Sequence, residues 1–262
     1  MKLKQSQFRT IQKKIYEYCG INLHEGKQAL VRARVMKRIR QLGVDDFSEY
    51  IEYLEKDASG KEFLSLVDVL TTNKTSFFRE SQHFDFIRDH VIPEINGRQV
   101  KWWSAGCSTG QEAISCSIVL QEELVKRNVV KILGTDISRD VIQIAKRGVY
   151  KAKKLADLSP KIKKKYFYKV DKSWYQINKE VRKMITYGRL NLKKPWPLNG
   201  PFHVIMCRNV MIYFNRETRQ ELIFRFHDIL EPGGYLFLGH SESVANTEGR
   251  FENILPAVYK KR

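Results

Sequence analysis

The sequence predicts an α/β fold: a doubly wound parallel sheet that carries a small inserted antiparallel β-subdomain and follows a small all-α domain. Three observations lead to this prediction. Apolar residues recur at helical spacing, with no strand pattern, until about residue 98. Short apolar runs then alternate with helical segments, as in a parallel sheet covered on both faces. One aromatic-rich stretch interrupts this alternation. We therefore expect domains at 1–72 and 73–262, with the insertion at about 160–187.

The composition is that of a globular and strongly basic chain. Of 262 residues, 42% are hydrophobic, and 47 Lys and Arg against 29 Asp and Glu give a net charge of +18. This charge favours an anionic partner, whether nucleic acid, an acidic membrane surface or an acidic protein. No apolar run is long enough to span a bilayer and no signal peptide is evident, so we expect a cytoplasmic protein without membrane insertion. Four scattered cysteines, without a C-x-x-C pair, indicate a reduced and metal-free protein.

Four helices account for the first domain, because apolar residues recur every three or four positions in four segments. Gly20 and Gly43 are expected to end the first two helices, and the Asp45-Asp46 pair to provide the N-cap of the third. The four segments are 8–18, 26–42, 47–54 and 61–70.

The second domain is predicted from apolar runs and the helices that separate them. The runs are 100–105, 131–135, 202–207 and 235–239, and the helices are 111–126, 141–147 and 217–230. Residues 166–187 are rich in Tyr, Phe, Trp, Val and Ile and predict antiparallel hairpins. The lysine-dense approach, 151–165, is interpreted as a solvated surface.

Two features of the second domain indicate a nucleoside site. A glycine loop at 106–110 follows the first strand, and Glu112 falls in the first turn of the next helix, where it would repel phosphate but accept from an amino group. Such a site suits an adenosine ligand without phosphates, such as S-adenosylmethionine. Asp136 ends the second strand, where an acid accepts from ribose hydroxyls. Alternatively, the glycine loop is only a structural turn, and Asp136 is only an N-cap of the helix that follows.

At this point the chain resembles a known family, the class I methyltransferases that modify chemotaxis receptors (the CheR family). The matching stretches run in family order over nearly the whole chain: TTNKTSFFRE (71–80), WSAGCSTGQE (103–112), GTDI (134–137), CRNVMIYF (207–214) and GHSE (239–242). The resemblance implies transfer of a methyl group from S-adenosylmethionine to receptor glutamates, giving glutamate methyl esters and S-adenosylhomocysteine. It also implies that the partners are the cytoplasmic helices of chemoreceptors.

The resemblance further implies roles for particular residues. Arg79 and Tyr213 are expected beside the reacting methyl group, as catalytic residues. Gln111 departs from the family pattern, in which many members have a second Glu. The residues expected to line the cofactor pocket are Asn73, Thr75, Arg79, Glu112, Asp136, Asn191, Leu192, Arg208 and Asn209.

Two other function classes fit the sequence less well. A nucleic-acid methyltransferase is suggested by the charge, but the run beginning at Arg208 lacks the Asn/Asp-Pro-Pro-aromatic motif of the amino-methylating enzymes. Cys207 resembles the nucleophile of cytosine-C5 methyltransferases, yet Met206 stands where those enzymes place Pro, so we interpret it as a buried thiol. A binding module without catalysis is disfavoured because the implied site residues are retained together. The histidines show no metal-ligand spacing.

Two segments are expected to govern recognition of the receptor. The helix at 26–42 contains no acid and carries Lys27, Arg34, Lys37 and Arg38, which we expect to attract acidic receptor helices. The resemblance places this helix beside the active-site cleft. In the family, the β-subdomain can dock a tethering peptide from the receptor tail, through a loop that contains glycine. Residues 166–176 contain no glycine, so we expect independence of that peptide. No nucleic-acid partner is expected.

Overall fold

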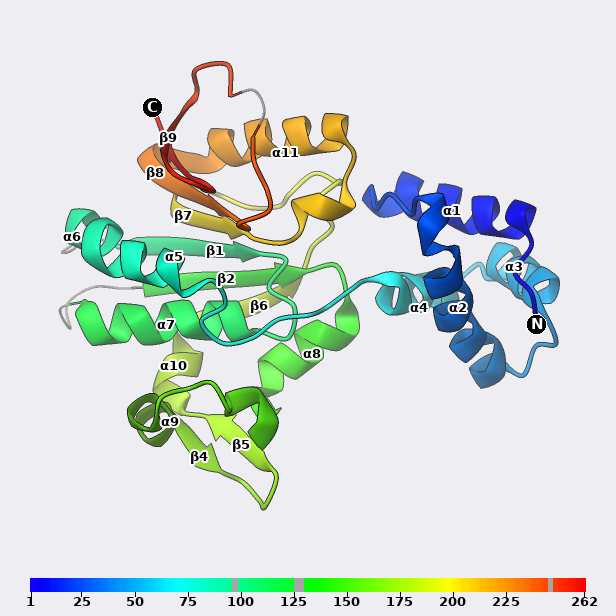
Figure 1. Cartoon of the computed structure of the whole chain (residues 1–262), viewed down its shortest axis with the longest axis horizontal. Helices are drawn as coiled ribbons and strands as arrows, with labels where there is room; N and C mark the ends of the chain where they lie inside the picture. Colours follow the sequence, from blue (N-terminus) through cyan, green and yellow to red (C-terminus); the bar gives the residue numbers. More distant parts are fainter. Residues whose placement is uncertain (96–98, 125–129, 245–246) are drawn as a thin grey trace.

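The computed structural model describes residues 1–95, 99–124, 130–244 and 247–262, arranged as a helical domain beside an α/β domain (Figure 1). Figure 1 shows the linker between them running from α4 to α5 along one side of the α/β domain. Among the residues that the structure describes, no helix combines the length and the apolar character needed to cross a membrane.

The helical domain confirms the predicted helices and their end signals. Gly20 and Gly43 adopt the left-handed conformation that ends α1 and α2, with φ of 76° and 71°. Asp46 caps α3 by accepting from the main-chain nitrogens of Ser48 and Glu49 at 2.7 and 3.0 Å. The helices are α1 (Gln5–Cys19), α2 (Gln28–Leu42), α3 (Phe47–Lys56) and α4 (Lys61–Leu70), with a short 3-10 turn, η1 (Glu25–Lys27), before α2.

The α/β domain is built on a seven-stranded sheet with the order β6-β2-β1-β7-β8-β10-β9. The strands from β6 to β8 are parallel, and β10 and β9 extend the sheet in antiparallel fashion. The four predicted strands are confirmed, whereas β6, β9 and β10 were not foreseen. The strands are β1 (Val100–Ala105), β2 (Val130–Asp136), β6 (Ile185–Arg189), β7 (Phe202–Cys207), β8 (Leu230–Leu238), β9 (Phe251–Leu255) and β10 (Val258–Lys261).

Helices cover both faces of this sheet, as the sequence predicts. The adjacent residues Trp102 and Trp103 are both fully buried and point to opposite faces. Trp102 packs with residues of α5–α7, and Trp103 packs with residues of α11. The helices are α5 (Ser81–Phe86), α6 (Ile92–Ile95), α7 (Gln111–Glu123), α8 (Arg139–Arg147) and α11 (Arg216–Ile229), with a π-helical turn η2 (Ile87–Val91) between α5 and α6. The predicted extension of α7 to Lys126 lies partly outside the described residues.

The inserted β-subdomain exists, but its limits differ from the predicted 160–187. Its three-stranded antiparallel sheet has the order β3-β5-β4 and already begins at β3. At its other end, residues 185–187 belong to β6, which pairs with β2 in the large sheet. An apolar segment can join either sheet, and its pairing partner is not visible in the sequence. The elements are β3 (Val149–Lys151), η3 (Ala152–Leu155), α9 (Pro160–Tyr166), β4 (Phe167–Lys169), β5 (Trp174–Ile177) and α10 (Lys179–Lys183).

Candidate active site between the two domains

A cavity lies where the carboxyl ends of β1, β2 and β7 face the helical domain. Its wall comes from the segment after α1, the linker after α4, the loops that follow these strands and the segment after β6. Parallel strands bring their carboxyl ends to one edge, so motifs far apart in the chain meet there. The structure gathers on this cavity every residue predicted for the cofactor pocket and for catalysis: Asn73, Thr75, Arg79, Glu112, Asp136, Asn191, Leu192, Arg208, Asn209 and Tyr213.

The loop after β1 requires glycine because it packs closely against another segment of the protein. Gly106 has a φ of +87°, and a Cβ there would lie 2.4 Å from Cγ2 of Val210. The loop therefore packs directly against the segment that follows β7. The glycine loop is therefore a structural turn, as the alternative interpretation predicts, and it also brings Ser108 into the cavity wall.

Asp136 is buried at the end of β2 and organises the loop beside it. Its two carboxylate oxygens accept from the main-chain nitrogens of Ser108 (2.9 Å) and Ser138 (3.0 Å). Ser138, not Asp136, caps α8, because its hydroxyl accepts from Val141. Burial raises the pKa of the Asp136 carboxyl, and the main-chain donors of Ser138 and Ser108 oppose that rise. A carboxylate can accept further hydrogen bonds, so Asp136 retains capacity for a ligand.

Glu112 and Arg208 line the cavity and form a chain of charges with Glu80, which lies behind them. Oε2 of Glu112 lies 3.2 Å from Nη1 of Arg208, while Nη2 of Arg208 lies 2.9 Å from Oε2 of Glu80. The Arg208 guanidinium is buried and also donates to the main-chain carbonyl of Arg79. Its charge is therefore committed to protein groups.

Burial raises the pKa of both carboxylates, but the opposing effect of Arg208 outweighs burial only at Glu80. Burial raises the pKa of Glu112, although Arg208 and the Ser104 hydroxyl, 2.7 Å from Oε1, favour the charged form. For Glu80, burial also raises the pKa, but the hydrogen bond and charge of Arg208 outweigh it and leave the pKa lowered. Glu80 is thus the more firmly ionised of the two.

The two residues expected beside the reacting methyl group are only partly engaged by the protein. Arg79 is 37% exposed and donates from Nη1 to the Lys74 carbonyl at 3.0 Å. Tyr213 lies half-buried in the 3-10 turn η4 (Met211–Tyr213), and its carbonyl accepts from the main-chain nitrogen of Asn22 at 2.8 Å. A segment of the helical domain thereby holds the backbone of Tyr213.

Sequence reasoning missed the role of Glu242, although it is part of the GHSE stretch. Its buried carboxylate accepts from three main-chain nitrogens, those of Gly239 (2.6 Å), Asn209 (2.8 Å) and Ile212 (3.1 Å). It joins the end of β8 to the loop that follows β7. Asn209 adopts a left-handed φ of 58° in this loop.

The four cations predicted on the second helix separate into two pairs. Arg34 donates to the carbonyls of Leu70 and Thr71 at the end of α4, at 2.8 and 3.0 Å. Arg38 forms a forked ion pair with the buried Glu62, at 2.9 and 2.5 Å. Both arginines therefore serve the packing of α2 against α4. Lys27 lines the cavity and Lys37 is exposed.

The end of α1 fastens the helical domain to the α/β domain. Nδ2 of Asn191, a predicted pocket residue, donates to the Tyr18 carbonyl at 2.7 Å. Lys193 donates to the Tyr16 carbonyl at 2.9 Å, and Asn215 donates to the Tyr16 hydroxyl at 2.7 Å. These contacts make the cavity a joint product of both domains.

All four cysteines are free and buried. Burial raises the pKa of the Cys207 thiol well above its ordinary value, which disfavours the nucleophilic thiolate. The interpretation of Cys207 as a buried strand-end thiol is therefore supported by its surroundings.

Comparison with known proteins places both domains. The model of the "CheR methyltransferase, all-alpha domain" matches residues 6–71, and that of the "CheR methyltransferase, SAM binding domain" matches residues 73–259. The chain is 36% identical to a chemotaxis protein methyltransferase of Borreliella burgdorferi, over 94% of this chain and 91% of that protein. It is 39% identical to a probable chemotaxis protein methyltransferase of Rhizobium etli (94% and 96% covered) and 36% identical to that of Escherichia coli (95% and 88% covered).

Proposed function

The chain belongs to the CheR methyltransferase family, and we propose that it transfers the methyl group of S-adenosylmethionine to glutamate side chains of chemotaxis receptors. The products are glutamate methyl esters and S-adenosylhomocysteine. The observation that carries the proposal is the gathering of the implied pocket residues, from the linker, the first turn of α7 and the ends of β2, β6 and β7, around one cavity.

The cavity suits an adenosine donor that carries no phosphate. Asp136 presents a buried carboxylate at the end of β2, where it would accept hydrogen bonds from the ribose hydroxyls. Glu112 lies in the first turn of α7, where its charge would repel phosphate and attract the amino group of the donor. Leu192 adds an apolar wall. These residues, with Asn73, Thr75, Asn191 and Asn209, would hold the cofactor.

Methyl transfer to a glutamate carboxylate needs no general base. S-adenosylmethionine, when bound, supplies a methyl group that its sulfonium charge has already activated. The accepting glutamate has an ordinary pKa of about 4.3, so it is ionised at neutral pH and is itself the nucleophile. The task of the protein is therefore to align the accepting carboxylate with the methyl group and to exclude water.

Arg79 and Tyr213 are the side chains that we assign to this alignment. Nη1 of Arg79 donates to the Lys74 carbonyl and Nε lies 4.0 Å from Glu80, and the guanidinium has further N–H donors for a carboxylate of the donor or of the acceptor. Tyr213 presents a ring and a hydroxyl to the same cavity. Arg208 acts on them indirectly, because it holds Glu112 and the main-chain carbonyl of Arg79.

For receptor recognition we assign two exposed cations, Lys27 in η1 and Lys37 in α2. Lys27 lines the cavity and Lys37 is exposed further along, whereas Arg34 and Arg38 are engaged by contacts with α4 and its C-terminal end. An acidic receptor helix would be attracted to this side of the protein. The proposal includes action in the cytoplasm, where the accepting receptor helices lie, and excludes nucleic acid as a substrate.

We further propose that no tethering peptide is required. Edge addition needs an accessible strand, and the edge strand β4 has only three residues, Phe167–Lys169. The turn that follows is fixed by Asp171, whose side chain accepts from the main-chain nitrogens of Ser173 (2.7 Å) and Trp174 (3.0 Å). Calorimetry with a receptor tail peptide should give no binding, and micromolar or tighter binding would refute this part of the proposal.

Radiolabelled S-adenosylmethionine tests the main proposal. The protein is incubated with receptor-containing membranes, with total RNA or with buffer, and the product is treated with mild base. We expect label on receptors only, released by base as methanol, as esters require. Label on RNA would support the nucleic-acid alternative instead. Tight binding of S-adenosylhomocysteine without transfer to either substrate would show a binding module that lacks catalysis.

A further inference from the structure

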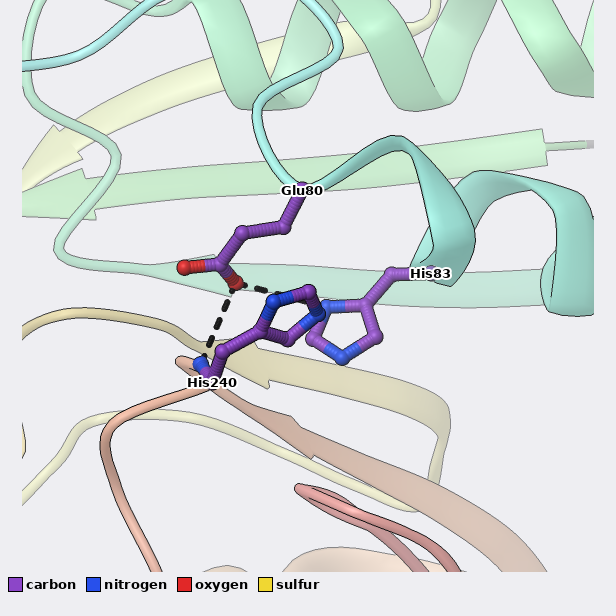
Figure 2. Close-up of side chains that lie close together, drawn as sticks. All are labelled: Glu80, His83 and His240. Atoms are coloured by element: carbon purple, nitrogen blue, oxygen red, sulfur yellow. Dashed lines mark hydrogen bonds and ion pairs between the residues drawn. The ribbon is translucent and has the colours of Figure 1, made fainter.

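Glu80, His83 and His240 bring three potential metal ligands together beside the Arg208 charge chain. One ligand atom from each residue lies within 4.8 Å of the others. Figure 2 shows the Glu80 carboxylate directed at both histidines. Oε2 of Glu80 is 3.7 Å from Nδ1 of His83 and 3.3 Å from the main-chain nitrogen of His240. The two imidazole rings meet edge to face at 4.7 Å between centroids.

His83 carries the observation that points to a ligand. It is only 2% exposed, yet neither of its ring nitrogens makes a hydrogen bond of normal geometry. A buried polar atom without a partner is costly, and native structures rarely leave one without a purpose.

The neighbouring Arg208 does not prevent Glu80 from acting as a ligand. Arg208 also pairs with Glu112 and donates to the Arg79 carbonyl, so its charge stays compensated when Glu80 turns toward a cation. His240 is exposed, which gives an ion a path from solvent to the buried histidine.

We infer that Glu80, His83 and His240 form a binding site for a transition-metal cation of the Zn²⁺ class. Two imidazole nitrogens and one carboxylate oxygen are a common three-ligand set for Zn²⁺, with water completing a tetrahedron. The three atoms, which lie within 4.8 Å of one another, must move closer together to reach that geometry. The bound ion would link the N-terminal end of α5 to the segment that follows β8.

The site is tested with Zn²⁺ and Co²⁺ added to the full chain after treatment with a chelator. Calorimetry should give one Zn²⁺ per chain, and Co²⁺ should give the visible absorption typical of tetrahedral coordination. His240→Ala removes an exposed ligand without disturbing the core, and it should weaken Zn²⁺ binding at least tenfold and abolish the Co²⁺ band. His90→Ala removes another exposed histidine and serves as the matched control.

Absence of stoichiometric Zn²⁺ binding would overturn the inference. So would binding that His240→Ala leaves unchanged, or that His90→Ala weakens to the same extent. His83→Phe provides a second variant: it keeps a ring in the core, and circular dichroism verifies folding. A folded His83→Phe protein that binds Zn²⁺ as well as the unchanged chain would also refute the site.

Discussion

The carboxylate of Glu242 accepts from the main-chain nitrogen of Asn209 at 2.8 Å, across the boundary between two adjacent strands of the sheet. Glu242 follows β8 and Asn209 follows β7, so this contact fixes one strand end against the next. The same carboxylate holds the nitrogens of Gly239 and Ile212. The loop that ends in Tyr213 therefore takes its shape from a residue 29 or more positions away in the chain.

Replacement of Glu242 should cost stability. In Glu242→Ala, three main-chain donors lose a charged acceptor, and the free energy of unfolding should fall by about 3 kcal/mol or more. Urea unfolding measures this difference. Glu252→Ala, at an exposed position of β9, is the control and should stay within about 0.5 kcal/mol of the unchanged protein. Equal losses for the two variants would contradict the role of Glu242.

Asp136 should control affinity for the reaction product. Asp136→Ala removes the carboxylate proposed to accept from ribose, so calorimetry should show S-adenosylhomocysteine bound roughly ten- to hundredfold more weakly, or about 1–3 kcal/mol. Asp140→Ala removes an exposed carboxylate from the adjoining helix and should leave affinity unchanged. Undiminished affinity in Asp136→Ala would remove it from the binding site.

Arg79 should matter for turnover far more than for folding. Its side chain is partly exposed, so Arg79→Ala should change the free energy of unfolding by no more than about 0.5 kcal/mol. Methyl transfer should fall at least tenfold, because a forked, charge-assisted contact with a carboxylate is lost. Arg79→Lys keeps the charge without the fork and should recover only part of the rate. A folded Arg79→Ala protein with nearly full activity would show that alignment occurs without it.

Lys37 should influence the rate of receptor methylation through long-range attraction. Lys37→Glu should slow methylation several-fold at low ionic strength, and the difference should disappear near 0.5 M salt, where charges are screened within a few ångströms. Lys131→Glu makes the same change in charge at the start of β2, the opposite end of the strand from the cavity. Identical salt profiles for the two variants would show that the α2 side of the protein is merely solvated.

The thiols should be almost inert in the folded protein. Burial raises the pKa of Cys19 to about 11, so at pH 8 only about one molecule in a thousand carries the thiolate. Its labelling by a disulfide reagent should be slow at pH 8 and accelerate about tenfold per pH unit, since the thiolate fraction rises with pH below the pKa. In urea, all four cysteines should react rapidly. Fast labelling of the native protein would show that the end of α1 opens readily.

Local sequence patterns predicted the elements whose structure is decided locally. The helices α1 to α4 follow from apolar spacing and from end signals such as Gly20 and Asp46. Pairing partners are not local, which is why β6 was assigned to the insertion and the edge strand β9, with exposed polar residues, was not foreseen.

In the candidate site, too, local sequence patterns predicted some features, and features that depend on distant contacts could not be predicted. Motifs that follow parallel strands could be placed together in advance, because such strand ends share one edge. The contacts of Arg34 and Arg38 with the end of α4 and with Glu62 could not be predicted, because helical spacing shows which side of a helix a residue occupies but not which element packs there. The grouping of His83 with His240 has no signal in the sequence at all, because it depends on where β8 ends relative to α5.

The hydrogen bond from Asn22 to the Tyr213 carbonyl ties the helical domain to the backbone of a residue that we propose to be catalytic. Any hinge movement that opens the cavity for product release must stretch or break this bond, and it thereby shifts the backbone that carries Tyr213. Opening of the cavity would then displace Tyr213 from its proposed catalytic position at the same time. The enzyme would be assembled for methyl transfer only while the two domains are closed on each other.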